Sequence, residues 1–138
     1  MKTIALFCLV LLLNSCSTEQ MIPREDLIGT WEPTYEIRQK DENGKWTDWQ
    51  TINTYILIPS ITFTADGKLL WNGVAANGCC SFTTYDLNGS DITLGGLITC
   101  PNVKCKICPT WKIIRLEENI LELAFCDAKQ ERYRLAKD

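Results

Sequence analysis

Tight-turn signals recur along this chain and separate segments in which apolar and polar residues alternate. Asn43-Gly44 and Asn88-Gly89 are dipeptides typical of hairpin loops, and Ala65-Asp66-Gly67-Lys68 is a further turn signal. No segment shows a helical periodicity long enough to cover a sheet. Together these properties predict an all-β fold built from hairpins.

The alternating segments predict eight or nine short strands after one turn of helix at Pro23–Leu27. Tight turns between consecutive strands favour an antiparallel up-and-down meander, and closure into a small barrel removes the exposed sheet edges. An open, strongly bent sheet is the alternative. In the last strand, Tyr133 and Leu135 are expected to face inward, with Arg132 and Arg134 outward. The predicted strands cover residues 29–38, 46–58, 61–64, 69–74, 81–87, 91–97, 111–116, 120–125 and 131–136.

The first residues have the pattern of a secretory signal. Lys2 is followed by the uncharged run Ile4–Leu13, which is about half as long as the roughly twenty residues that span a bilayer as a helix. Leu13-Asn14-Ser15-Cys16 resembles the lipobox of bacterial lipoproteins, which implies removal of residues 1–15 and acylation of Cys16, with palmitate among the acyl groups. A plain secretory signal with a chance cysteine is the alternative. We therefore expect a lipidated tether at 16–24, which anchors a β domain at 25–138 to the membrane.

Charge and composition exclude several classes of function. Removal of residues 1–15 takes away one of 14 basic residues and none of the 17 acidic ones, so the net charge of the remainder is −4 and does not attract nucleic acid. The chain has no histidine, the commonest general base and metal ligand. The paired carboxylates lie at element ends or turns, where solvated charges are ordinary. We expect no catalytic residue, no cofactor and a monomer; the carboxylate pairs are 25/26, 41/42 and 117/118.

Six cysteines remain once Cys8 leaves with the signal and Cys16 is acylated. An even number in an oxidising compartment predicts up to three disulfides. A bond from Cys79 or Cys80 to Cys100 is the first expected pair, because it joins neighbouring strands of the meander, and Cys105 or Cys108 with Cys126 is the next. The disulfide candidates are Cys79, Cys80, Cys100, Cys105, Cys108 and Cys126.

The motif Cys105-Lys106-Ile107-Cys108 has three interpretations. It resembles half of a zinc site, but zinc needs two further ligands and histidine is absent. A thioredoxin-like redox pair would open a helix beside a βαβ unit, and none is predicted. We therefore assign it to the disulfide framework, with no metal site, and expect Pro101–Pro109 to be a stapled loop.

Several segments resemble a known family. Leu27–Trp31, Phe63–Lys68 and Arg132–Arg134 resemble the lipocalin-like lipoproteins of Bacteroidetes-type bacteria. That resemblance implies a small barrel in which Arg132 or Arg134 lies across the ring of Trp31 as a structural contact. The segments Gly78–Phe82 and Leu97–Pro101 are similar to the two ends of the META-domain motif, which is the second choice.

Two functions follow from these readings. The first is an anchored envelope lipoprotein whose barrel binds a small hydrophobic ligand, with Trp46, Trp49 or Trp71 near the barrel mouth. Core packing is the alternative role for these side chains. The second is a META-like, non-enzymatic accessory with no cavity, which contacts an envelope protein through loops. Because Ser17 follows the acylated cysteine in place of Asp, we expect the outer membrane, on its periplasmic or surface face.

Overall fold

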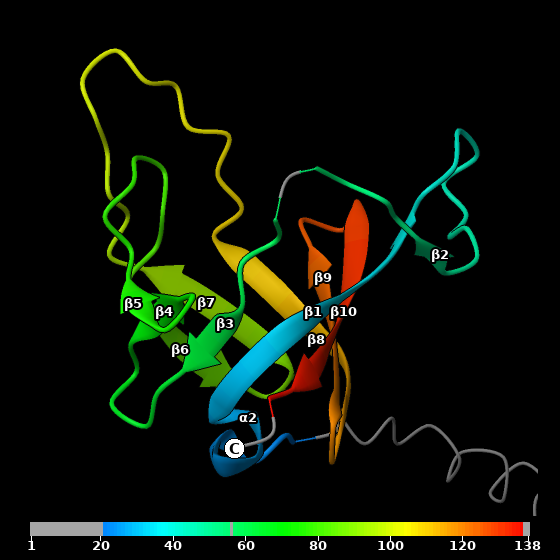
Figure 1. Ribbon diagram of the computed structural model, residues 1–138, viewed down its shortest axis with the longest axis horizontal. Coiled ribbons are helices and arrows are strands. Elements are labelled where there is room, and N and C mark those ends of the chain that lie inside the picture. Colours follow the sequence, from blue (N-terminus) through cyan, green and yellow to red (C-terminus); the bar gives the residue numbers. More distant parts are fainter. Residues whose placement is uncertain (1–20, 56, 137–138) are drawn as a thin grey trace, which may run out of the picture.

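The computed structural model describes residues 21–55 and 57–136, which form one antiparallel sheet after a single turn of helix (Figure 1). The predicted signal peptide, Cys16 and most of the tether lie outside the described residues. No helix in the described part of the chain is long and apolar enough to cross a bilayer. The elements are α2 (Arg24–Leu27), β1 (Gly29–Gln39), β2 (Gln50–Thr51), β3 (Ile61–Phe63), β4 (Leu69–Trp71), β5 (Val74–Ala75), β6 (Thr84–Asn88), β7 (Asp91–Gly95), β8 (Thr110–Glu117), β9 (Ile120–Phe125) and β10 (Lys129–Leu135).

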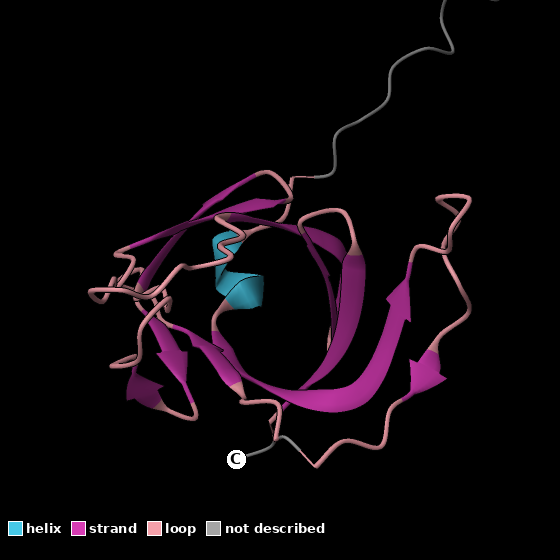
Figure 2. Ribbon diagram, turned by 90° about the horizontal axis from the view of Figure 1, so that it is seen from above, coloured by secondary structure: helices cyan, strands magenta, loops and turns pink. Residues whose placement is uncertain are grey.

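The sheet curls until its two ends meet (Figure 2). Its strand order is β5-β4-β3-β1-β10-β9-β8-β7-β6, and Lys68, next to β4, forms an isolated bridge with Thr84 of β6. At this seam the Leu69 N–H donates to the Thr83 carbonyl at 2.9 Å, and the Tyr85 N–H donates to Gly67 at 2.9 Å. The wall is therefore an eight-stranded up-and-down barrel within the described residues, to which β2 and β5 are short additions. The predicted meander is confirmed.

The barrel is filled by alternate residues of its strands, which point inward and exclude water. Fully buried side chains come from α2, β1, β3, β4, β7 and β9, and Tyr133 of β10 joins them. The Phe63 and Tyr85 rings meet edge to face with centroids 5.0 Å apart. The described wall, core and disulfides lie within residues 22–135, so this segment contains a complete barrel. The largest fully buried residues are Leu27, Trp31, Ile61, Phe63, Leu69, Ile92, Leu121 and Leu123.

The two ends of the barrel differ. Because successive strands run antiparallel, the connections alternate between them, and α2 closes one end, which we call the helix end. There the Trp31 indole N–H donates to the Leu27 carbonyl at 2.9 Å, and the Arg24 guanidinium lies 5.2 Å from the Tyr85 ring. All six described cysteines lie on connections at the opposite end, which we call the cysteine end.

The long strand predicted at Trp46–Ile58 is wrong. Among the described residues of this segment only Gln50–Thr51 form a strand, and this strand pairs with β1. The reason is a bulge between Pro33 and Ile37, where Tyr35 has a φ of 61°. The start of β1 pairs with β3, so only the residues of β1 at the far side of the bulge can pair with β2. The other described residues of the predicted strand therefore have no neighbouring strand to pair with.

The predicted contact of Arg132 or Arg134 with Trp31 is also wrong. Trp31 pairs with Leu135 and points into the core, whereas Arg132 and Arg134 alternate onto the outer face. The Arg132 guanidinium lies instead 4.2 Å from the ring centroid of Trp49. Ion pairs of 3.0 Å to Glu36 and 2.9 Å to Glu122 hold the Arg132 guanidinium there. Because successive side chains of a strand point to opposite faces of the sheet, Arg132 lies on the outer face and does not contact Trp31.

Candidate functional site

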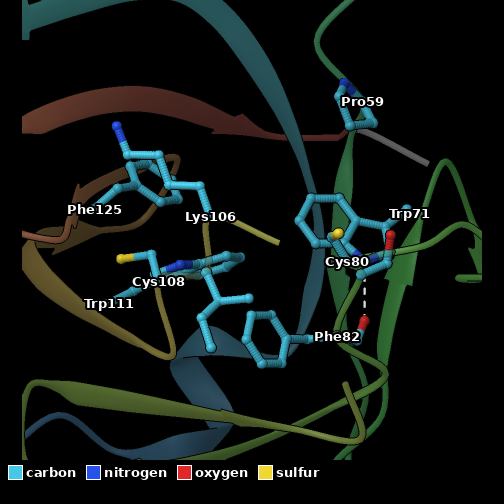
Figure 3. Close-up of a pocket in the computed structure, with 10 residues that line it drawn as sticks. Pro59, Trp71, Cys80, Phe82, Lys106, Cys108, Trp111 and Phe125 are labelled. Carbon is cyan, nitrogen blue, oxygen red and sulfur yellow. Dashed lines mark hydrogen bonds between the residues drawn. The ribbon is translucent and has the colours of Figure 1, made fainter. Parts of the chain in front are cut away.

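A cavity of about 480 Å³ opens at the cysteine end (Figure 3). Its walls come from β4, β8 and β9, from the segment before β6, and from the loop between β7 and β8. Five of its lining residues have large apolar or aromatic side chains, and one is charged. The lining residues are Pro59, Trp71, Cys80, Ser81, Phe82, Lys106, Ile107, Cys108, Trp111 and Phe125.

Three aromatic rings form the continuous part of the wall. Trp71 and Trp111 meet edge to face with centroids 6.0 Å apart, and Trp111 meets Phe125 in the same way at 4.9 Å. The Trp71 indole N–H donates to the Phe82 carbonyl at 3.2 Å, which fixes the orientation of its ring. Trp71 and Phe125 are only partly buried, so the wall can pack against an apolar molecule.

Disulfide bonds attach the loop between β7 and β8, which lines the cavity, to the barrel. Cys79 bonds to Cys100, Cys80 to Cys105, and Cys108 to Cys126, with Cα atoms 5.5, 5.2 and 5.6 Å apart. The two predicted pairs, one to Cys100 and one to Cys126, are confirmed. The predicted stapled loop is confirmed as well, because residues 96–109 carry no strand and hold three of the six bonded cysteines.

The two cysteines of the C-x-x-C motif bond to partners on different walls and not to each other. Cys105 reaches the segment before β6, and Cys108 reaches the end of β9. Their sulfurs are therefore not thiolates, the form that zinc binds. In the described part of the chain no group of His, Cys, Asp and Glu residues could hold a metal ion.

Charged groups are sparse around the cavity. Lys106 is the charged residue among the lining residues, and its ammonium makes no ion pair within the described residues. Beside the cavity, the Lys129 ammonium lies 5.5 Å from the Phe125 ring centroid and forms an ion pair with Glu131. Glu131 also accepts a hydrogen bond from the Tyr133 hydroxyl. Burial, and then the Glu131 charge, raise the pKa of Tyr133 well above its usual value.

Of the three tryptophans proposed for the mouth, the structure places only Trp71 at this cavity. Trp49 stacks on Arg132 and also lies 4.8 Å from the Arg38 guanidinium, on the outer face of β1 and β10. Trp46 lies over Arg38 and Lys40 and lines a separate hollow of about 530 Å³. The two rings lie on the outer face of the sheet, where they contact the side chains of Arg38, Lys40 and Arg132.

Sequence reasoning missed Trp111, Phe82 and Phe125 as cavity residues. The inward parity of Trp111 and Phe125 is readable from their alternating strands. Their position at the same end of the barrel as Trp71 follows only from the strand directions. The carboxylate pairs 25/26, 41/42 and 117/118 are exposed and lie away from the cavity lining.

Comparison with known proteins adds one structural likeness. No family model matches the chain, and no curated protein matches it. Among solved structures, the chain is similar to a lipocalin-like protein from Bacteroides uniformis ATCC 8492, with a TM-score of 0.39 and 20% identity over 80% of this chain and 99% of that one. The assignment of the fold as an up-and-down barrel depends on the strand order and the seam between β4 and β6.

Proposed function

We propose that this chain is a non-enzymatic, lipid-anchored envelope protein whose barrel binds a small apolar ligand at the cysteine end. The observation that carries the proposal is the aromatic cavity of about 480 Å³. Ligand sites are typically concave, of roughly 300–1,000 Å³, and lined mainly by apolar and aromatic side chains with few polar groups. Trp71, Trp111, Phe82 and Phe125 give the cavity that character.

The anchor is proposed from the sequence and is compatible with the disulfides. Leu13–Cys16 resembles a lipobox, and acylation of Cys16 would tether the barrel to the membrane. Three disulfides fit a compartment outside the cytoplasm, where thiols are oxidised. We place the protein at the outer membrane, facing the periplasm or the cell surface.

Ligand binding is tested with a neutral fluorescent probe, N-phenyl-1-naphthylamine, and by native mass spectrometry. The chain is exported behind an ordinary cleavable signal, so that the soluble protein begins at Ser17. We expect saturable binding of the probe and its loss in Trp71→Ala, whose side chain lines the cavity. Trp49→Ala is the matched control, because it removes the same side chain from the outer face. Equal probe binding by both variants, or none by the parent, would contradict the proposal.

The anchor is tested separately in cells fed an alkyne-labelled fatty acid. The full chain should acquire the label and remain with the membrane fraction, whereas Cys16→Ser should do neither. Label in the Cys16→Ser variant, or an unlabelled parent, would reject acylation at this position without affecting the proposal for the cavity.

The alternative function, an accessory that contacts an envelope protein through its loops, has one observation in its favour. Val103 and Ile107 on the stapled loop are exposed, at 48% and 45%. Under this alternative, crosslinking of the protein to a partner in cells should be lost in Val103→Ser and in Ile107→Ser. Trp71→Ala should leave the crosslinks unchanged. The reverse pattern favours the ligand-binding function.

A further inference from the structure

The segment Cys105–Cys108 is a short bridge that is fixed at both ends. Cys105 is bonded to Cys80, before β6, and Cys108 is bonded to Cys126, after β9. The two residues between them, Lys106 and Ile107, both line the cavity, and Figure 3 labels Lys106 there. The two disulfides therefore hold this bridge across the cavity from two different walls, so its backbone has little freedom to move away.

The bridge brings a positive charge to an otherwise apolar cavity. Lys106 is the charged residue among the ten that line it, and none of the lining residues is acidic. Like Lys45, Lys104 and Lys112, Lys106 forms no ion pair with a carboxylate among the described residues, and it differs from these three in lining this cavity.

The Lys106 side chain is exposed at the rim of the aromatic cavity, where its ammonium can meet an anion. Its interaction with a negative group strengthens as water is displaced by an apolar body, because the local dielectric constant falls. Aromatic rings and Ile107 can cover the apolar body, and the ammonium can donate to a carboxylate or sulfonate oxygen. A neutral ligand would use the walls but leave the charge of Lys106 unused.

We propose that the ligand class of this cavity is a small organic monoanion, with an aromatic or acyl body held by Trp71, Trp111 and Phe125 and an acidic head group paired with Lys106. The proposal rests on the ligand-binding function above. In it the C-x-x-C motif is neither a redox pair nor a metal site, but a doubly fixed support for the residue that recognises the head group.

The test compares two probes that share one aromatic framework. 1-Anilinonaphthalene-8-sulfonate carries a sulfonate, and N-phenyl-1-naphthylamine lacks it. Lys106→Gln should weaken binding of the sulfonate probe about three- to fivefold, near the upper end of the range for exposed ion pairs, because Lys106 is exposed. Binding of the neutral probe should change less than about twofold. Lys104→Gln is the matched control, because it removes the same charge from the same loop at a position that does not line the cavity.

Each outcome decides between the two proposals. If both probes bind and Lys106→Gln weakens only the anion, and if added salt weakens the parent's binding of the anion alone, the inference holds. If Lys106→Gln behaves like Lys104→Gln, or weakens both probes equally, the anionic class is wrong while the apolar cavity stands. If neither probe binds the parent, or Trp71→Ala leaves both unchanged, the ligand-binding function itself is wrong. Thermal unfolding and intact mass under non-reducing conditions confirm that each variant is folded with its disulfides.

Discussion

The two ends of the barrel are closed by different kinds of interaction. At the helix end, Leu27, Trp31 and Phe63 are at most 1% exposed, and a hydrogen bond from Trp31 to Leu27 attaches α2 to β1. At the cysteine end, three disulfides attach the loops, and the aromatic wall behind them borders a cavity. The same eight-stranded barrel therefore has a packed core at one end and a cavity at the other.

The difference has an energetic reason. A hollow forfeits the contacts between apolar side chains that a filled core would make. Each disulfide that closes a loop of this size contributes about 3 kcal/mol by restricting the unfolded chain, and the three here have sequence separations of 21, 25 and 18. Covalent bonds can thus stabilise the end whose packing is incomplete.

The largest expected effect comes from breaking the packed end. Trp31→Ala should lower the free energy of unfolding by about 3–5 kcal/mol, because it removes a buried indole and its hydrogen bond to Leu27. Urea unfolding followed by circular dichroism measures this. Trp49→Ala, which loses a half-buried stack on Arg132, should cost only about 0.5–2 kcal/mol. Similar losses in the two variants would mean that the helix end is not the packed part of the fold.

The next largest effect separates two disulfides at the hollow end. Removing Cys79–Cys100 or Cys80–Cys105 by paired substitution to alanine should cost about 3 kcal/mol in either case. Only the second should also weaken binding of the sulfonate probe, since Cys80 lines the cavity and Cys105 supports Lys106. Urea midpoints and probe titrations of the two double variants test this. Equal probe binding by the two would show that the bridge does not shape the cavity.

An intermediate effect is expected from the buried hydroxyl of Tyr133. Tyr133→Phe removes the hydrogen bond to Glu131 and should cost about 1 kcal/mol at neutral pH. The pKa of Tyr133 is raised in the folded state, so folding favours the neutral phenol. That contribution is complete below the unfolded pKa of about 10 and is lost as the pH rises above it. The parent should therefore lose more stability than Tyr133→Phe on going from neutral to strongly alkaline pH. A parallel decline in urea midpoints would contradict this assignment.

The packed end and the turns were predictable because they depend on local pattern. Asn88-Gly89 and Asp66-Gly67 each specify a turn by their own backbone preference, and the inward face of Tyr133 follows from strict alternation. Two of the three disulfide pairs could be anticipated for a related reason, because they join neighbouring parts of the meander.

The composition of the cavity could not be predicted in the same way. Trp71 and Trp111 are 40 residues apart in sequence and meet only because closure between β4 and β6 brings their strands round the barrel. The placement of Trp46 and Trp49 depends on the bulge in β1, which has no clear sequence signal. Long-range closure and local irregularity are tertiary properties, so periodicity within one strand does not report them.

The smallest expected effect lies on the exposed rim of the packed end, in the turn between β3 and β4. Hydrogen bonds from Lys68, and then from Thr64, lower the pKa of Asp66 from 3.8 to about 2. A lowered folded pKa means that the carboxylate stabilises the fold above about pH 4 and that this contribution disappears as the pH falls towards about 2. Asp66→Asn should therefore have a slightly lower urea midpoint than the parent at neutral pH and the same midpoint near pH 2. Because the pair is fully exposed, water screens it, and the difference at neutral pH should be far smaller than that of Trp31→Ala. A large loss at neutral pH would instead mean that this turn, beside the β4–β6 seam, holds the barrel closed, and that the helix end depends on its rim as well as on its core.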